Sequence, residues 1–234
     1  FTPGHESCVL DVAGIKLGLL ICEDAWFEMP AQKAREAGAQ ILLVLNASPF
    51  HVGKGLEREV QMAQRVKECG LPLIYAHLVG GQDEVIFEGR SFAINGQGQV
   101  VARAPAFQEC LQTIKVQVEP GQSGLTLTGQ QISEECTWQE DLWRALVLGI
   151  QDYLGKNGFS GAILGLSGGI DSALVLALAV DAIGADKIHA VMMPSPYTAD
   201  ISWLDAREMA QRLGVRYDEI SIAPLFEGFK QALA

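Results

Sequence analysis

The chain has 234 residues, with 17 Lys or Arg and 28 Asp or Glu, so its formal net charge is −11. This length suits one large domain or two small ones. Hydrophobic residues make up 49% and charged residues 19%, which excludes general disorder. The longest strongly apolar stretch, 173–180, is far shorter than the roughly 18 residues that a membrane span needs. The acidic balance, without a Lys/Arg-rich run, argues against nucleic-acid binding, so we expect small-molecule partners, with no nucleic acid and no membrane.

The cysteines form an odd set without a C-x-x-C pair: Cys8, Cys22, Cys69, Cys110 and Cys136. This pattern predicts neither a disulfide framework nor a zinc site, and it favours a reducing, cytoplasmic location. The chain begins without Met and stops inside a predicted helix. Both ends are therefore expected to be cut.

The first half alternates short apolar strands with helical stretches. Strands are predicted at 15–21, 41–45 and 73–77, and helices at 30–37 and 56–69. Two further strands, 91–94 and 100–104, are separated by Asn95-Gly96-Gln97-Gly98, which is typical of a hairpin turn. A last strand is predicted at 111–118, where apolar residues alternate.

A linker is predicted at 119–136, which is rich in Gly, Gln, Ser and Thr and contains a Pro-Gly turn signal. It would separate a first domain at 1–118 from a second at 137–234.

The second domain begins with a capping box formed by Thr137 and Glu140, which predicts a helix at 138–156. The elements that follow are a strand at 162–166, a helix at 171–183, a strand at 188–193, a helix at 199–213, a strand at 216–220 and a final helix. This order is typical of a doubly wound parallel sheet, so the fold class is α/β.

A glycine loop joins the first strand and helix of this second domain, with the sequence Ser167-Gly168-Gly169-Ile170-Asp171-Ser172. Glycines allow the backbone amides to point outward, and the helix N-terminus favours an anion such as a phosphate. The loop has no Lys, so it does not fit the Walker pattern. A Mg²⁺ ion held by Asp171 is one way to neutralise the phosphate charge. The alternative is that Ser167 and Asp171 only cap a helix.

The loop resembles the pyrophosphate loop of the N-type ATP pyrophosphatases, which adenylate a carbonyl or carboxylate oxygen. The resemblance implies ATP binding by Gly165, Leu166, Ser167, Gly168, Gly169, Ile170, Asp171 and Ser172, and Mg²⁺ at Asp171. The segments 193–198, 205–206 and 213–215 resemble the NAD synthetase branch in particular; Pro196 receives no binding role.

A cysteine follows an apolar strand in the first domain, in Leu19-Leu20-Ile21-Cys22-Glu23-Asp24-Ala25-Trp26. The two carboxylates beside Cys22 disfavour a thiolate, so a cation or base elsewhere is required. The segment resembles the nucleophile region of the nitrilase superfamily, whose members use a Glu–Lys–Cys triad. The resemblance implies that Cys22 is the nucleophile and that the Glu and Lys precede it. Only Glu6 and Lys16 lie upstream, in contexts that do not match; the other cysteines are expected to be inert.

The segment 46–54 resembles the part of this family that holds glutamine, with Ser48 accepting from or donating to the α-substituents and Lys54 pairing with the α-carboxylate. Without the resemblance, a surface loop is an equally good reading. His51 and His77 are expected to be structural or solvent-facing. The segment Glu88-Gly89-Arg90-Ser91 also fits the family but is assigned no chemistry.

The two halves together resemble the glutamine-dependent NAD synthetases. The resemblance implies a partial nitrilase-like α-β-β-α sandwich followed by a partial doubly wound domain of the adenine nucleotide alpha hydrolase type. It implies a ligase that uses glutamine, ATP and deamido-NAD, and a homo-oligomer. Two other readings stay open: a non-catalytic nucleotide-binding piece and a stand-alone carbon–nitrogen amidase.

Overall fold

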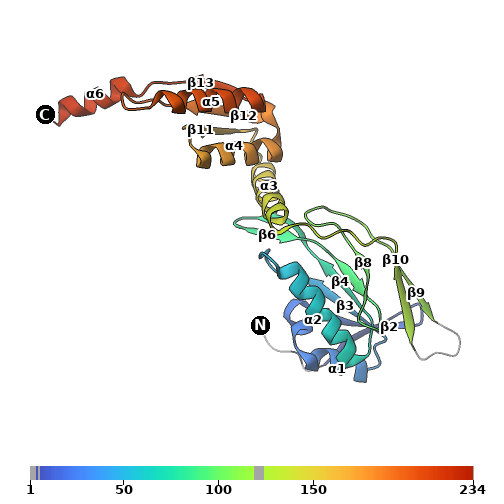
Figure 1. Ribbon diagram of the computed structural model, residues 1–234. Helices are drawn as coiled ribbons and strands as arrows, with labels where there is room; N and C mark the ends of the chain where they lie inside the picture. Colours follow the sequence, from blue (N-terminus) through green and yellow to red (C-terminus); the bar gives the residue numbers. More distant parts are fainter. Residues whose placement is uncertain (1–3, 5, 119–123, 234) are drawn as a thin grey trace. The chain divides into compact units, whose positions relative to one another are not determined.

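The computed structural model describes residues 4, 6–118 and 124–233. By backbone contacts the chain divides into two compact units: Phe1–Gly80 with Glu84–Ala145, and Gly81–Asp83 with Leu146–Ala234. Each unit is described by itself (Figure 1). No helix of the described residues is long and apolar enough to cross a membrane.

A six-stranded mixed sheet organises the first unit, in the order β1-β2-β3-β4-β7-β8. β2, β3 and β4 are parallel to one another, whereas the strands at both edges pair antiparallel. The elements in chain order are β1 (Cys8–Val12), β2 (Ile15–Ile21), the 3-10 helix η1 (Cys22–Trp26), α1 (Glu28–Glu36), β3 (Ile41–Asn46), α2 (Lys54–Cys69), β4 (Leu73–His77), β5 (Val79–Gln82), β6 (Val85–Glu88), β7 (Phe92–Ile94), β8 (Val100–Arg103), β9 (Ile114–Val118) and β10 (Leu125–Gly129).

Helices α1 and α2 pack side by side against one face of this sheet, as Figure 1 shows. Leu20, Val44 and Tyr75 lie on neighbouring strands in one row of the sheet and are buried beneath the helices. Their neighbours on the other face are partly or fully exposed, and Ile21 and Leu45 form one exposed pair. The alternation of burial therefore fixes which side chains face α1 and α2.

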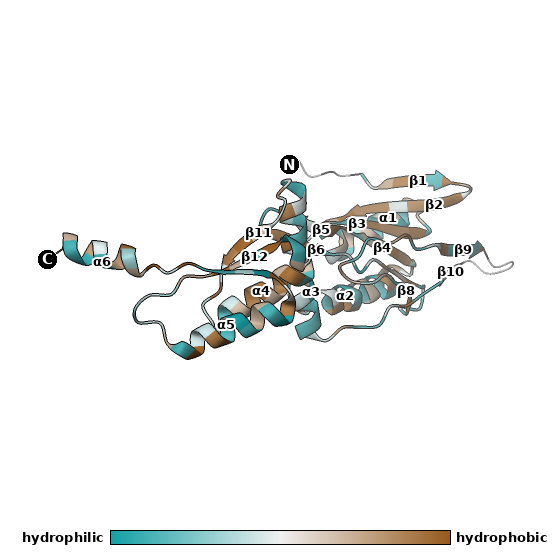
Figure 2. Cartoon of the chain, turned by 90° about the horizontal axis from the view of Figure 1, so that it is seen from above, coloured by the Kyte–Doolittle hydropathy of each residue, from teal (hydrophilic) through white to brown (hydrophobic). Residues whose placement is uncertain are grey.

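A three-stranded parallel sheet forms the centre of the second unit, in the order β11-β12-β13. Figure 2 shows β12 as mostly hydrophobic, consistent with a strand that pairs on both sides. The elements are α3 (Trp138–Lys156), β11 (Ala162–Gly165), α4 (Ile170–Ile183), the 3-10 helix η2 (Ala185–Lys187), β12 (Ile188–Met192), α5 (Asp200–Leu213), β13 (Arg216–Glu219) and α6 (Ala223–Ala232). The β-α-β-α-β order with parallel strands confirms the α/β prediction for this unit.

Most predicted elements exist, with shifted ends. The predicted helix at 56–69 begins two residues earlier, at Lys54, because Gly53 adopts the left-handed conformation before it. The predicted strand at 111–118 begins only at Ile114. The turn at Asn95 is confirmed, since Asn95 Oδ1 accepts bonds from the amides of Gln97 and Gln99, both at 3.0 Å.

Several elements were not predicted from the sequence. These are β1, η1, the β5–β6 hairpin and β10. β10 lies within the predicted linker 119–136 and pairs antiparallel with β9. The division into 1–118, 119–136 and 137–234 itself stays a prediction.

Candidate active site

Three parallel strands bring polar side chains to one end of the sheet in the first unit. β2 ends at Ile21, opposite Leu45, and Asn46 is opposite His77. Cys22 follows Ile21 directly, so it lies at the same end of the sheet as Asn46 and His77. The carboxyl ends of parallel strands are a common location for ligand sites in α/β folds.

Cys22 has an unusual backbone. Its φ is 48°, in the left-handed region that non-glycine residues seldom occupy. It begins η1 directly after β2 and is partly exposed. The amide of Ile21 donates to Asp24 Oδ2 at 3.0 Å, which closes the turn around it. The sharp turn follows the end of β2 at Ile21 and leaves Cys22 partly exposed at the carboxyl end of the strand.

Ser48, two residues beyond β3, lies in a cluster of buried polar groups. Its Oγ accepts a hydrogen bond from Asn46 Nδ2 at 2.9 Å and another from Arg58 Nη2 at 3.0 Å. His77 Nε2 lies 3.5 Å from the same Oγ. Ser48 is thus joined to three side chains from β3, α2 and β4.

Arg58 and Glu88 form a buried ion pair beside Ser48. Arg58 Nη1 donates to Glu88 Oε1, and each side chain is only 2% exposed. Arg58 lies on the face of α2 that packs against the sheet, in line with Met62 and Arg65. A charged pair at this depth is stable only when both partners are present and hydrogen-bonded.

His77 is held neutral by its surroundings. Burial, with the nearby positive charge of Arg58, lowers the pKa of His77 to about 4. Its Nδ1 donates to the carbonyl oxygen of Leu78 at 2.8 Å, because a carbonyl oxygen can only accept. Nε2 therefore carries no proton and faces Ser48 as an acceptor.

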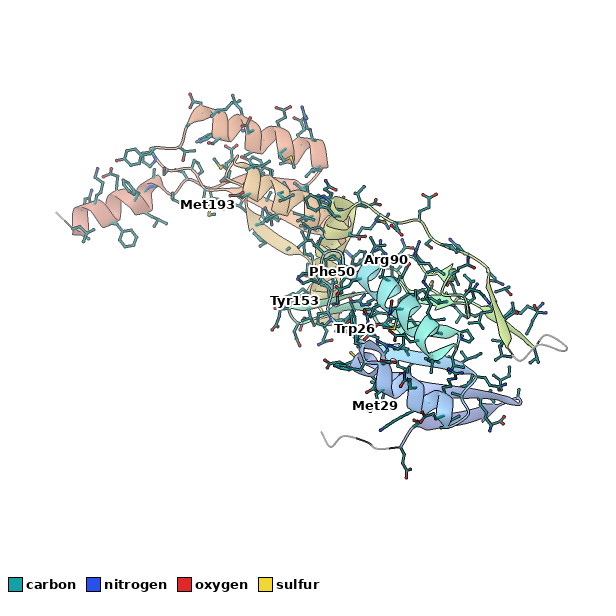
Figure 3. The ribbon with its side chains drawn as sticks, turned by 60° about the horizontal axis from the view of Figure 1, so that its bottom comes forward. Trp26, Met29, Phe50, Arg90, Tyr153 and Met193 are labelled. Carbon is teal, nitrogen blue, oxygen red and sulfur yellow. The ribbon has the colours of Figure 1, made fainter. Side chains whose placement is uncertain are left out.

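Lys54 lies at the start of α2. Its Nζ is 4.2 Å from the centroid of the Trp26 ring and 3.0 Å from Glu57 Oε2. Trp26 follows Cys22 by four residues, so Lys54 belongs to the Cys22 end of the unit. Figure 3 shows Trp26, Phe50 and Arg90 around the amino-terminal part of α2.

Sequence reasoning missed several members of this cluster. His77 was expected to be structural or solvent-facing; it is buried and contacts Ser48, whereas His51 is exposed. The segment 88–91 was assigned no chemistry, but Glu88 pairs with Arg58 and Ser91 Oγ accepts from the amide of His77 at 2.9 Å. One signal was available: Arg58 shares the helical spacing of the apolar stripe of α2.

The glycine loop of the second unit joins β11 to α4. Gly168 has a φ of 80°, and a Cβ there would lie 2.7 Å from Ser202 Cα, at the start of α5. Ser167 Oγ accepts from the amide of Gly169 at 3.2 Å and lies 3.0 Å from Ser172 Oγ. The loop is therefore held by its own hydroxyl groups and by close packing on α5.

A hollow of about 230 Å³ adjoins this loop. It is lined by Gly165, Leu166, Ser167, Val191, Met192, Met193 and Thr198. Met193, which Figure 3 labels, follows the last residue of β12 and reaches toward Gly165. The carboxyl ends of β11 and β12 thus open onto one shared space.

Asp171 lies in the first turn of α4 and is exposed. The N-cap position of α4 is Gly169, so neither Ser167 nor Asp171 occupies it. Within the described residues there is no group of three or more His, Cys, Asp or Glu side chains arranged to hold a metal ion. A cation at Asp171 would need further ligands from elsewhere, such as phosphate oxygens.

The first unit has the features of one class of protein: α/β enzymes with a cysteine at the carboxyl end of their parallel strands. The carbon-nitrogen hydrolase family model matches residues 1–123, more than half of the chain. The chain therefore belongs to the carbon-nitrogen hydrolase family. The NAD synthase family model matches residues 142–234.

Relatives match the chain along nearly its whole length. A glutamine-dependent NAD(+) synthetase of Xylella fastidiosa is 44% identical over 231 residues, which are 99% of this chain and 42% of that protein. One from Thermotoga maritima is 32% identical, covering 100% of this chain and 46% of that protein. A structure of glutamine-dependent NAD+ synthetase from Acinetobacter baumannii in complex with ADP superposes with a TM-score of 0.93 at 39% identity, covering 100% of this chain and 44% of that one. The chain spans less than half the length of these relatives.

The buried state of His77 predicts a pH-dependent stability. The unfolded chain binds a proton near pH 6.5 and the folded chain only near pH 4, so acidification between these values favours unfolding. This contribution is fully present above pH 6.5, and we expect about 2 kcal/mol of it to be lost between pH 7 and pH 5. Urea unfolding at both pH values measures it. The His77→Asn variant should lose about 2 kcal/mol less than the unsubstituted protein; an equal loss contradicts the prediction.

Proposed function

We propose that this chain is the part of a glutamine-dependent NAD synthetase that carries its cysteine nucleophile and its ATP loop. Residues 1–118 would belong to the glutaminase and residues 137–234 to the synthetase. One observation carries the proposal: a single chain contains both a carbon-nitrogen hydrolase cysteine site and an NAD synthase glycine loop. Cysteine enzymes that only cleave amides have no use for the second feature.

In the glutaminase reaction, the Cys22 thiolate attacks the side-chain amide carbon of glutamine. The carbon–nitrogen bond then breaks, ammonia leaves with a proton from a general acid, and a glutamyl thioester remains on Cys22. Water hydrolyses the thioester to glutamate and returns the thiol. The position of Cys22 after β2, partly exposed on a sharp turn, supports its role as nucleophile. The Glu and Lys of the family triad would come from outside this chain.

Ser48 and Lys54 are proposed to bind the α-substituents of glutamine. Ser48 is held by Asn46 and Arg58 at the end of the sheet where β2 leads into Cys22. The Lys54 ammonium, next to Trp26, supplies a positive charge for the α-carboxylate.

The glycine loop is proposed to bind ATP through Gly165–Ser172. The N-terminus of α4, which follows the loop directly, favours the phosphates. The Asp171 carboxylate is exposed in the first turn and is a hard oxygen ligand, which fits Mg²⁺ shared with phosphate oxygens. The bound ion would neutralise phosphate charge as pyrophosphate leaves.

The synthetase reaction follows from the weakness of a carboxylate as an acyl donor. The nicotinate carboxylate of deamido-NAD attacks the α-phosphorus of ATP, forms an adenylate and releases pyrophosphate. Ammonia attacks the activated carbonyl, and AMP leaves as NAD forms. A cytoplasmic homo-oligomer remains part of the proposal on family resemblance.

Cys22→Ala should abolish glutamine-dependent NAD formation because no thioester can form. NAD formation from free ammonia should continue, since the second unit needs no thiol. The full-length product of this gene is assayed with ATP, deamido-NAD and either ¹⁵N-amide glutamine or ammonium. Cys110→Ala, at an exposed cysteine, is the matched control. Continued use of glutamine by the Cys22→Ala enzyme contradicts the assignment.

Asp171 is tested with two substitutions. Asp171→Ala and Asp171→Asn should both reduce Mg-ATP-dependent turnover at least 100-fold with either nitrogen source, because both remove the anionic ligand. Asn keeps the size and polarity of Asp without its charge, and no helix cap is lost, because the N-cap position of α4 is Gly169. Full activity in Asp171→Asn would therefore assign Asp171 a structural role alone. Turnover is followed by pyrophosphate release.

Gly168→Ala should weaken ATP binding at least tenfold. Its Cβ would overlap the backbone of Ser202, and its φ of 80° is unfavourable for alanine, so the loop must move. Gly155→Ala is the matched control, because Gly155 lies in α3 outside the loop and its Cβ would meet nothing within 4 Å. Calorimetry with ATP compares the two variants; equal affinities would show that the close approach does not shape the site.

A further inference from the structure

The side chains around Ser48 determine which hydrogen bonds its hydroxyl can still make. A serine oxygen can accept two hydrogen bonds and donate one. Asn46 Nδ2 at 2.9 Å and Arg58 Nη2 at 3.0 Å occupy both accepting directions. The hydroxyl of Ser48 is left with its hydrogen alone for any further partner.

Within the described part of the chain, His77 is the neighbour that can accept this hydrogen, and it is distant. His77 Nε2 is unprotonated and lies 3.5 Å from Ser48 Oγ, beyond the 2.5–3.0 Å typical of hydroxyl donors. A carboxylate oxygen is a stronger acceptor than this and forms shorter bonds. A ligand carboxylate would therefore compete with His77 for the Ser48 hydrogen, whereas an ammonium group would find no accepting position.

Arg58 is placed to maintain this arrangement. Its two terminal nitrogens divide between Glu88 Oε1 and Ser48 Oγ, so the ion pair fixes the guanidinium while the second nitrogen reaches Ser48. Arg58 Nε and Glu88 Oε2 are buried without a hydrogen-bond partner among the described residues. This buried pair, with each side chain 2% exposed, therefore holds Arg58 in the position from which it donates to Ser48.

We propose that Arg58, held by Glu88, is a positioning residue that makes Ser48 a hydrogen-bond donor only, so that Ser48 selects the α-carboxylate of the amino-acid substrate and not its ammonium group. This inference rests on the proposed glutaminase function. It gives the Ser48 contact a direction, from the hydroxyl to the α-carboxylate. The Lys54 ammonium, at the start of the helix that carries Arg58, also favours a carboxylate.

The test compares three amides that differ only in their α-substituents: glutamine, 5-amino-5-oxopentanoate, which lacks the amino group, and 4-aminobutanamide, which lacks the carboxylate. Arg58→Lys keeps a positive charge beside Glu88, but a single ammonium lacks the fork that reaches Ser48 as well. In the full-length gene product, ammonia release should show a KM about tenfold higher for both carboxylate substrates, with kcat within twofold. For 4-aminobutanamide, kcat/KM should be unchanged.

A double-mutant cycle connects the effect to Ser48. Ser48→Ala should raise the same two KM values about tenfold, and adding Arg58→Lys to it should raise them no further. Arg103→Lys is the matched control, since it weakens the partly buried pair between Arg103 and Glu59 of α2 without touching Ser48. It should leave all KM values unchanged.

Two outcomes for Arg58→Lys overturn the proposal. One is an equal loss of kcat/KM for all three amides, and the other is a loss confined to the two amides that carry an amino group, glutamine and 4-aminobutanamide. Additive effects in the double variant overturn it as well. Failure of the proposed function is distinct, because ammonia release from glutamine would then survive Cys22→Ala. If release requires Cys22 while Arg58→Lys acts on all substrates alike, only the positioning role is wrong.

Discussion

The register of three parallel strands is the constraint on which the first unit depends. Because β2, β3 and β4 run in the same direction, the residues after them meet at one end of the sheet. The pairing of Leu20, Val44 and Tyr75 in the core determines that Asn46 and His77 follow on the same face, while Cys22 comes directly after β2 at the same end of the sheet. A shift of one residue in any strand would turn its polar residue to the opposite face. Packing of the core and placement of the site are thus one requirement.

The side of α2 that packs against the sheet carries charged residues, where a helix normally presents apolar side chains. Arg58 and Arg65 both lie on the buried side of α2 and use their guanidinium groups differently. Arg58 joins Glu88 and Ser48, whereas Arg65 donates to the carbonyl oxygens of Ala25 and Trp26 after Cys22. Helix α2 therefore supports both the loop after β2 and the loop after β3. Its two arginines connect the packing of the helix with the shape of the site.

Much of this could be predicted from the sequence, for identifiable reasons. Strands such as 15–21 and 73–77 are mostly apolar runs, and the residues at Cys22 and the glycine loop form local motifs. The strand β10 (Leu125–Gly129) was missed because it alternates Leu and Thr over only a few residues, within a stretch rich in Gly, Gln, Ser and Thr, and pairs with β9. The Arg58–Glu88 pair joins residues 30 apart in the chain, and no local pattern contains that contact. Long-range polar pairing was the part that required the structure.

The close approach of Gly168 to α5 gives a reason for a glycine at this position that does not involve a ligand. A side chain at this position would overlap the backbone of Ser202, whatever ligand the loop holds. Glycine is thus demanded here by the packing of one helix start against a turn, independently of any phosphate. Gly169, whose Cβ would meet little, is under no such demand from the protein itself. Of the two adjacent glycines, the second is therefore the more informative about what approaches the loop from outside.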